Sequence, residues 1–152
     1  MKIRLLLAAS IAVALCLWTL DRPHAAAKEL GIGSPAPELD IEHWIQDGNG
    51  FFKPVKTFDQ GKVYVVEFWA TWCGPCRAEL PNIKKAYEKY HEHGLEVVGV
   101  SIDQDRKSVE DYVEEQEVPW ITLHEKDDAG KNPATKRYGI FGIPTMFLVG
   151  RD

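Results

Sequence analysis

The sequence contains little cysteine and no excess of positive charge, and each of these shortages excludes some classes of function. Its 152 residues include 18 lysines and arginines against 23 aspartates and glutamates, which gives a formal net charge of −5 at pH 7. Nucleic-acid binding depends on cationic side chains, and this chain has neither a basic stripe nor an aromatic platform for bases. Nucleic acid is therefore excluded as an expected partner.

Long apolar runs are also scarce, and the one substantial run lies near the N-terminus. Lys2 and Arg4 precede residues 5–20, an apolar segment shorter than the roughly 17–25 residues of a membrane helix. Alanines at 25–27 then offer a cleavage site, so residues 1–27 are expected to form a secretory signal peptide. An uncleaved anchor formed by residues 5–20 is the alternative, and both interpretations predict that the rest of the chain is exported.

The three cysteines do not suggest a structural role. Cys16 belongs to the N-terminal segment, which leaves Cys73 and Cys76 in the single domain expected over residues 28–152. A disulfide between cysteines three positions apart closes too small a loop to stabilise a fold much. A structural zinc site needs two further ligands at recognisable spacing, and the histidines form no such pattern, so no metal is expected. Redox chemistry is the favoured function of the pair.

The cysteine pair lies between a predicted strand and a predicted helix. Residues 63–69 are rich in β-branched and aromatic side chains, which predicts a buried strand. Helical spacing then runs to about residue 93, so Cys73 is expected at the helix N-terminus, where free N–H groups and the helix dipole favour the thiolate. Cys73 is the predicted nucleophile, partly exposed, and Cys76, one turn deeper and shielded, is the predicted resolving thiol.

The residues VEFWATWCGPC resemble the active-site segment of the thioredoxin superfamily. Pro81, five residues past Cys76, resembles the proline that kinks the active-site helix in that superfamily. The segment at 142–145, Gly-Ile-Pro-Thr, resembles the loop that carries the family's cis-proline. The segment at 33–37, Gly-Ser-Pro-Ala-Pro, is similar to the beginning of TlpA/ResA-like and peroxiredoxin-like members.

This resemblance implies a thioredoxin-like three-layer α/β fold with a central mixed sheet and an N-terminal strand extension. Strand and helix patterns alternate along the chain, in agreement with that class. The predicted elements are strands at 42–46, 51–53, 95–102, 121–123 and 146–149 and helices at 108–116 and 132–139. Relatives continue past the last strand with another strand and a helix, so the domain is expected to be C-terminally incomplete or a fragment. Either case would expose a sheet edge and an apolar face.

Two acids are candidates for proton transfer near the cysteines. Glu67 interrupts the apolar strand, and burial would raise its pKa and make it a proton acceptor for Cys76. Its position resembles that of the buried acid of thioredoxins, and the alternative is a strand glutamate that reaches a lysine or water. Glu79 follows Cys76 by three residues, a spacing that resembles that of a glutamate beside the cysteines in ResA-like reductases. The alternative is an ordinary solvated glutamate near the start of the helix. If both flank the pair, their repulsion would keep one of them protonated to higher pH.

The resemblance also implies a substrate-binding rim around the sulfurs. Its members would be Trp72, Gly74, Pro75, Ile143 and Pro144. Pro144 is expected to be cis, and the backbone of Ile143 is expected to bond to the substrate backbone. Trp69 is predicted to pack in the core, and Trp120 and Phe141 in the core or the rim.

The predicted function is an exported thiol–disulfide oxidoreductase of the TlpA/ResA-like kind, without a cofactor. It would act as a reductase on exported proteins, with apocytochrome c as one candidate substrate and a membrane thiol as electron donor. A peroxiredoxin would need threonine or serine where Ala70 stands, three residues before Cys73, and is rejected. A non-catalytic copper-binding module is the alternative, although His124 lies in no ligand motif and is expected to be a surface residue.

Overall fold

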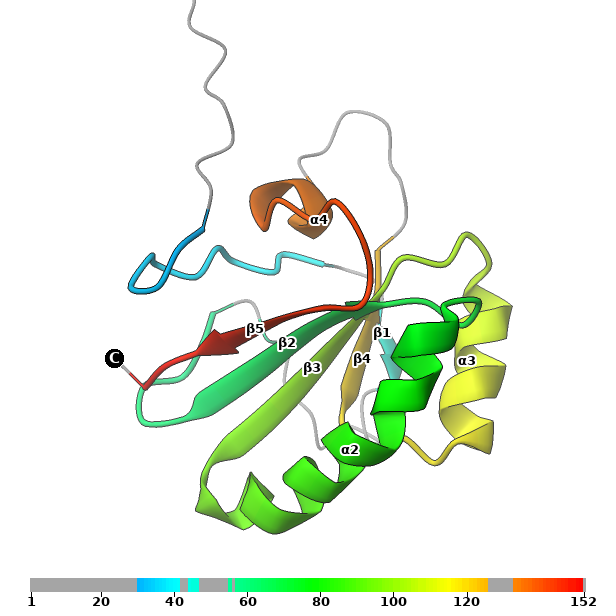
Figure 1. Ribbon diagram of the computed structural model, residues 1–152, viewed down its shortest axis with the longest axis horizontal. Helices are drawn as coiled ribbons and strands as arrows, with labels where there is room; N and C mark the ends of the chain where they lie inside the picture. The colour runs from blue at the N-terminus through cyan, green and yellow to red at the C-terminus, as the bar shows by residue number, and fades with distance from the viewer. Residues whose placement is uncertain (1–29, 42–43, 47–54, 56, 126–132, 152) are drawn as a thin grey trace, which may run out of the picture.

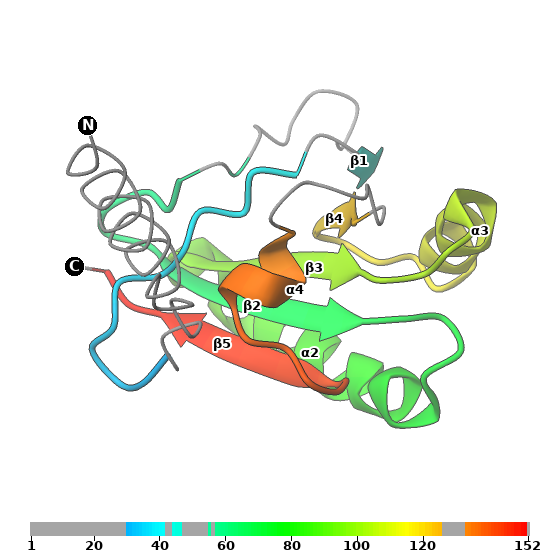
Figure 2. The ribbon, with the colours of Figure 1, turned by 90° about the horizontal axis from the view of Figure 1, so that it is seen from above.

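The computed structural model describes residues 30–41, 44–46, 55, 57–125 and 133–151 (Figure 1). Helices α2 (Gly74–Tyr90) and α3 (Arg106–Glu115) cover one face of a central sheet. The short helix α4 (Ala134–Arg137) and the segment 30–41 lie over the other face (Figure 2). The predicted three-layer α/β architecture is confirmed.

The sheet has five strands in the order β1-β4-β3-β2-β5. The strands are β1 (Trp44–Gln46), β2 (Val63–Trp69), β3 (Leu95–Ser101), β4 (Ile121–His124) and β5 (Thr145–Val149). The three inner strands, β4, β3 and β2, are parallel, and β1 and β5 join them antiparallel at the two edges. The mixed sheet and the N-terminal strand extension are therefore confirmed, whereas the strand predicted at 51–53 lies outside the described residues.

Strand β2 has the bounds that its composition predicted, and its side chains separate the two cores. Tyr64, Val66 and Phe68 are buried on the face covered by α4 and Leu39. Trp69 packs on the opposite face, in the cluster that includes residues of α2 and α3. Since side chains alternate along a strand, Glu67 shares the face of Trp69 and points toward the helix that carries the cysteines.

Helix α2 begins directly after Cys73 and ends close to the predicted position. Pro75 lies in its first turn, where a missing N–H costs nothing, and Pro81 lies within the helix. Its last turn tightens into a 3₁₀ segment, His91–His93, and Gly94 then adopts the left-handed conformation with φ 92°. Ile83 and Tyr87 are buried on its inner face, whereas Tyr90, the last residue of the helix, is 46% exposed.

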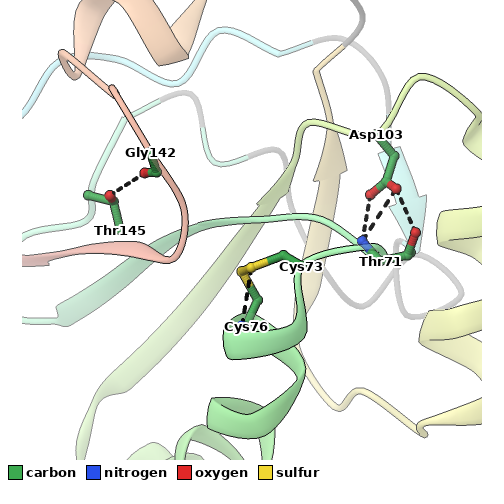
Figure 3. The surroundings of a disulfide bond; sticks show 6 residues. All are labelled: Thr71, Cys73, Cys76, Asp103, Gly142 and Thr145. Carbon is green, nitrogen blue, oxygen red and sulfur yellow. Dashed lines mark hydrogen bonds between the residues drawn. A yellow bond between two sulfur atoms is a disulfide. The ribbon is translucent and has the colours of Figure 1, made fainter.

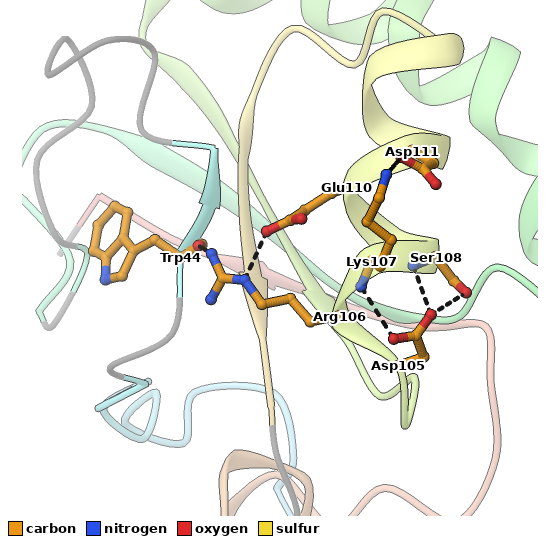
Figure 4. Close-up of polar contacts among 7 residues, drawn as sticks. All are labelled: Trp44, Asp105, Arg106, Lys107, Ser108, Glu110 and Asp111. Carbon is orange, nitrogen blue, oxygen red and sulfur yellow. Dashed lines mark hydrogen bonds and ion pairs between the residues drawn. The ribbon is translucent and has the colours of Figure 1, made fainter.

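Helix α3 begins two residues earlier than predicted because Asp105 caps it. The Asp105 carboxylate accepts hydrogen bonds from the backbone N–H groups of Lys107 and Ser108 (Figure 4). Arg106 pairs with Glu110 one turn on and donates to the backbone oxygen of Trp44 in β1. This helix is thereby fixed to the edge of the sheet.

Strand β5 forms the edge of the sheet beside β2. Its Phe147 and Val149 pack into the core on the α4 side. On its other face, Leu148 is 74% exposed and Met146 39% exposed. The expected exposure of apolar side chains at this edge is confirmed.

Candidate active site

Cys73 and Cys76 form a disulfide at the N-terminus of α2 (Figure 3). Their Cα atoms are 5.3 Å apart. Cys73 is the N-cap residue, and its Sγ accepts a hydrogen bond from the backbone N–H of Cys76 over 3.2 Å. In the reduced protein the same N–H group is placed to stabilise a thiolate on Cys73.

Both sulfur-bearing side chains are buried in the disulfide. Cys76 is 3% exposed, which agrees with its predicted shielding. Cys73 is 5% exposed, so its predicted partial exposure is wrong for this oxidation state. Cys73 belongs to the buried cluster that contains Trp69 and Ala70. Solvent exposure therefore does not distinguish Cys73 from Cys76, whereas the residues around each sulfur do.

Cys76 shares a small cavity with the carboxyl group of Glu67. The cavity has a volume of about 10 Å³, and its other lining residues are Trp69, Leu80, Tyr112, Val118 and Trp120. Glu67 is only 4% exposed. Burial, followed by the negative charge of Glu79, raises the pKa of Glu67 from 4.5 to about 7. A carboxyl group with this pKa exchanges its proton readily at neutral pH.

Glu79 lies one turn beyond Cys76 on α2 and is half-buried. Its carboxylate accepts a hydrogen bond of 3.3 Å from the side-chain amide of Asn82. Its charge reaches Glu67 and disfavours the ionised form of that residue. The predicted repulsion between the two acids is thus present, and it acts on the more deeply buried partner.

The loop that precedes β5 faces the disulfide (Figure 3). The Ile143–Pro144 peptide bond is cis, as the resemblance predicted. The Thr145 hydroxyl donates a hydrogen bond of 2.6 Å to the backbone oxygen of Gly142 within this loop. Ile143 is half-buried and contacts both core clusters, whereas Pro144 is exposed.

Exposed residues of the predicted rim surround the cysteines. Trp72 is 65% exposed, and Gly74 and Pro75 are exposed beside it. Trp69 is buried as predicted, and Trp120 is also buried in the core, whereas Phe141 is fully exposed, which excludes the core alternative for that residue. An open groove of about 660 Å³ adjoins Gly74 and continues between α2 and α3; its other lining residues are Arg77, Ala78, Tyr112, Glu115 and Gln116.

A buried polar cluster centred on Asp103 lies beside the disulfide, and it was not predicted from the sequence. The Asp103 carboxylate accepts hydrogen bonds from Thr71 and Ser101, and its backbone oxygen contacts the ring of His124. His124 is 3% exposed, so its prediction as a surface residue is wrong. Ser101 and Asp103 are polar residues at and just after the end of an otherwise apolar strand. Parallel strands bring such residues together at one edge of the sheet, so this pattern could have indicated the cluster.

The described residues contain no group of three histidine, cysteine, aspartate or glutamate side chains that could hold a metal ion. In the same part of the chain, none of the helices combines the length and the apolar character that crossing a bilayer requires.

Comparison with known proteins agrees with this geometry. The profile described as AhpC/TSA family matches residues 32–152. The thiol-disulfide oxidoreductase ResA of Bacillus thuringiensis subsp. konkukian is 30% identical over 99% of this chain and 84% of the relative. ResA of Oceanobacillus iheyensis is 30% identical over 78% of this chain, which spans only 59% of that relative.

A solved structure supports the same grouping. The crystal structure of the thioredoxin domain of a thiol-disulfide oxidoreductase from Bacteroides vulgatus aligns with a TM-score of 0.66 at 28% identity. The alignment covers 81% of this chain and 84% of that domain. Fold and sequence therefore lead to the same group of relatives.

Proposed function

This chain belongs to the AhpC/TSA family, with ResA thiol–disulfide oxidoreductases among its relatives, and we propose that it reduces disulfides in exported proteins through Cys73 and Cys76. The observation that carries this proposal is the disulfide at the start of α2, with Cys73 as the helix cap. The buried acid beside Cys76 supplies the base that the second step needs.

The first step is attack by the Cys73 thiolate on one sulfur of a substrate disulfide. A bond forms between Cys73 and that sulfur, the substrate disulfide breaks, and the other substrate sulfur leaves as a thiolate that takes up a proton. The helix N-terminus stabilises the attacking thiolate. The exposed rim, Trp72 and the loop of Ile143 and Pro144, is placed to hold the substrate chain around this mixed disulfide.

The second step releases the substrate. Cys76 gives its proton to the Glu67 carboxylate and attacks the Cys73 sulfur, which expels the second substrate thiolate. The products are a substrate with two thiols and the protein with the Cys73–Cys76 disulfide. Regeneration needs two electrons from a dithiol donor, and for an exported protein that donor is a membrane thiol carrier.

The N-terminal sequence supports an exported location, with residues 1–27 as a signal peptide or residues 5–20 as an anchor. The haem-binding cysteines of apocytochrome c form one suitable substrate disulfide, and disulfides of other exported proteins are equally suitable. The copper-binding alternative is disfavoured. His124, the histidine considered as a copper ligand, is buried, and its ring is hydrogen-bonded to the backbone oxygen of Asp103.

Trapping of the mixed disulfide tests the mechanism. In a Cys76→Ser variant, a peptide disulfide should become bound covalently through Cys73, whereas Cys73→Ser should trap nothing; capture through Cys76 would reverse the assignment.

The reduction potential of the Cys73–Cys76 couple should lie nearer the roughly −270 mV of thioredoxin than the roughly −120 mV of a strong oxidant. Equilibration with glutathione measures it.

The proton acceptor is tested separately with Glu67→Gln, which keeps the shape of the side chain and removes the base. Release of the substrate from the mixed disulfide should slow by roughly 10²-fold at neutral pH, and formation of the mixed disulfide should change little. Equal release rates in both proteins across pH 5 to 9 would remove Glu67 from the mechanism.

A further inference from the structure

Asp103 is a buried carboxylate at the end of β3 for which the exchange mechanism has no role so far. It is 4% exposed. Its oxygens accept hydrogen bonds from the backbone N–H of Thr71 over 3.0 Å and from the Thr71 hydroxyl over 2.6 Å (Figure 3). They also accept one from the Ser101 hydroxyl over 2.8 Å. A buried carboxylate is costly unless such donors surround it, so the cluster fixes these groups relative to one another.

The partners of Asp103 come from three neighbouring parts of the fold. Thr71 belongs to the connection between β2 and α2, Ser101 ends β3, and His124 ends β4. The ring nitrogen Nε2 of His124 lies 2.7 Å from the backbone oxygen of Asp103, and the Asp103 N–H donates to the Ser101 hydroxyl over 3.1 Å. The residue is therefore fixed by its own backbone as well as by its carboxylate.

Thr71 is two residues before Cys73, in the turn that sets the position of the attacking sulfur. The Cys73 N–H closes this turn by donating to the backbone oxygen of Ala70 over 3.1 Å. On the other side, the Ile102 N–H donates to the backbone oxygen of Trp69 over 3.0 Å. Asp103 thus adds a side-chain attachment of the turn to the segment that follows β3.

We propose that Asp103 is a positioning residue for the thiol–disulfide exchange proposed above: by holding Thr71 through two hydrogen bonds, it keeps the Cys73 sulfur at the N-terminus of α2. When the turn is held, Cys73 Sγ stays within reach of the Cys76 N–H. When it is released, the sulfur spends less time there, the thiolate loses stabilisation, and attack on substrate slows. This inference rests on the proposed function, and it assigns Asp103 no contact with substrate.

Two variants separate positioning from the charge of the carboxylate. Thr71→Val removes one donor and leaves the Asp103 charge in place, whereas Asp103→Asn removes the charge and disturbs both bonds to Thr71. Asp105→Asn is the matched control, since Asp105 also accepts bonds from two backbone N–H groups and a hydroxyl but caps α3. Thr71→Ser, which restores the hydroxyl, should rescue most of the loss seen in Thr71→Val.

The readouts are the pH midpoint of Cys73 alkylation in the reduced protein, the rate of attack on a peptide disulfide, and the potential of the couple. Positioning predicts that Thr71→Val and Asp103→Asn both move the alkylation midpoint to higher pH and slow attack by roughly 3- to 10-fold, with a more negative potential. Asp105→Asn keeps a side chain that can cap α3 and should leave these readouts unchanged.

Two results would overturn the inference while the proposed function stands. If Asp103→Asn lowers the alkylation midpoint and Thr71→Val leaves it unchanged, the carboxylate acts by its charge alone. If both variants lose only thermal stability, Asp103 has a structural role and no part in positioning. Failure of the proposed function itself would look different, because the unmodified protein would then exchange no disulfide.

Discussion

Glu67 and Cys76 line the same buried cavity, the acid from the central strand β2 and the thiol from the first turn of α2. This relationship follows from the alternation of side chains along β2, which turns Glu67 to the face covered by α2. It places a group that titrates near pH 7 beside the sulfur that must lose its proton. The predictions below begin with this pair.

Glu67→Gln should change how stability depends on pH. Because the folded-state pKa of Glu67 is raised from 4.5 to about 7, the folded protein holds this proton over that range while the unfolded chain releases it. The stability of the unmodified protein should therefore fall between about pH 4.5 and 7, with a total loss of roughly 3 kcal/mol. Glu67→Gln should lack this loss, and urea unfolding of the oxidised proteins at pH 5 and pH 8 measures the difference.

Glu79→Gln should lower the pKa of Glu67, because the repulsion from Glu79 is one of the two causes that raise it. Burial, the larger cause, is unchanged, so the value should stay well above 4.5. Carboxyl NMR shifts of Glu67 across pH measure the change. A Glu67 titration that does not move would show that Glu79 has no influence at this site. Glu88→Gln, on the exposed side of α2, is the control.

Gly99→Ala should destabilise the protein. An added Cβ would lie 3.1 Å from the indole nitrogen of Trp69 and 3.5 Å from that of Trp120, and both rings are buried. Overpacking of this kind costs about 1–3 kcal/mol. Gly31→Ala has open space around it and should have little effect. Thermal unfolding of the two variants side by side makes the comparison, and equal stability would show that the indoles move aside freely.

Thr122→Val should leave the fold intact and raise its stability by about 1 kcal/mol. The Thr122 hydroxyl oxygen is buried and has no hydrogen-bond partner in the part of the chain that the structure describes. Valine has nearly the same shape, needs no partner and favours strands. Denaturant unfolding checks this, and a loss of more than about 1 kcal/mol would reveal a partner for the hydroxyl.

Trp72→Ala should weaken exchange with protein disulfides while the fold keeps its stability. The side chain is 65% exposed, so its removal leaves no cavity in the core. The value of kcat/KM for a protein substrate should fall by roughly 10-fold, since large aromatic side chains contribute most of the binding energy at protein–protein contacts. A small aromatic disulfide reagent, which needs no rim, provides the comparison and should react at an unchanged rate.

The features that the sequence predicted well are those set by local pattern. β2 carries a run of β-branched and aromatic residues, and its bounds agree with the prediction. The place of Cys73 before α2 followed from the local strand and helix patterns, and the cis bond at Pro144 was expected from the resemblance of residues 142–145 to the family's proline loop. Each of these depends on residues within a few positions of one another.

The features that were missed depend on partners far apart in the chain. His124 reads as an isolated histidine, and only the pairing of β3 with β4, which sets Ser101 opposite it, shows why it is buried. Asp103 and Thr71 are brought together because β2 and β3 are parallel and end at the same edge. The burial of Cys73 depends on residues of the surrounding cluster, such as Trp69 and Trp120, which come from different parts of the fold.

The pairing of β2 with β5 has a consequence for the order in which the site is assembled. Phe68, five residues before Cys73, lies opposite Thr145, the residue after Pro144. A slip of one residue in this register would turn every side chain of β5 to the wrong face and carry the proline loop away from the sulfurs. During synthesis the cysteines emerge long before β5, so a partly made chain exposes reactive thiols with no loop opposite them. Such a chain would be open to wrong disulfides until residues 145–149 have joined the sheet.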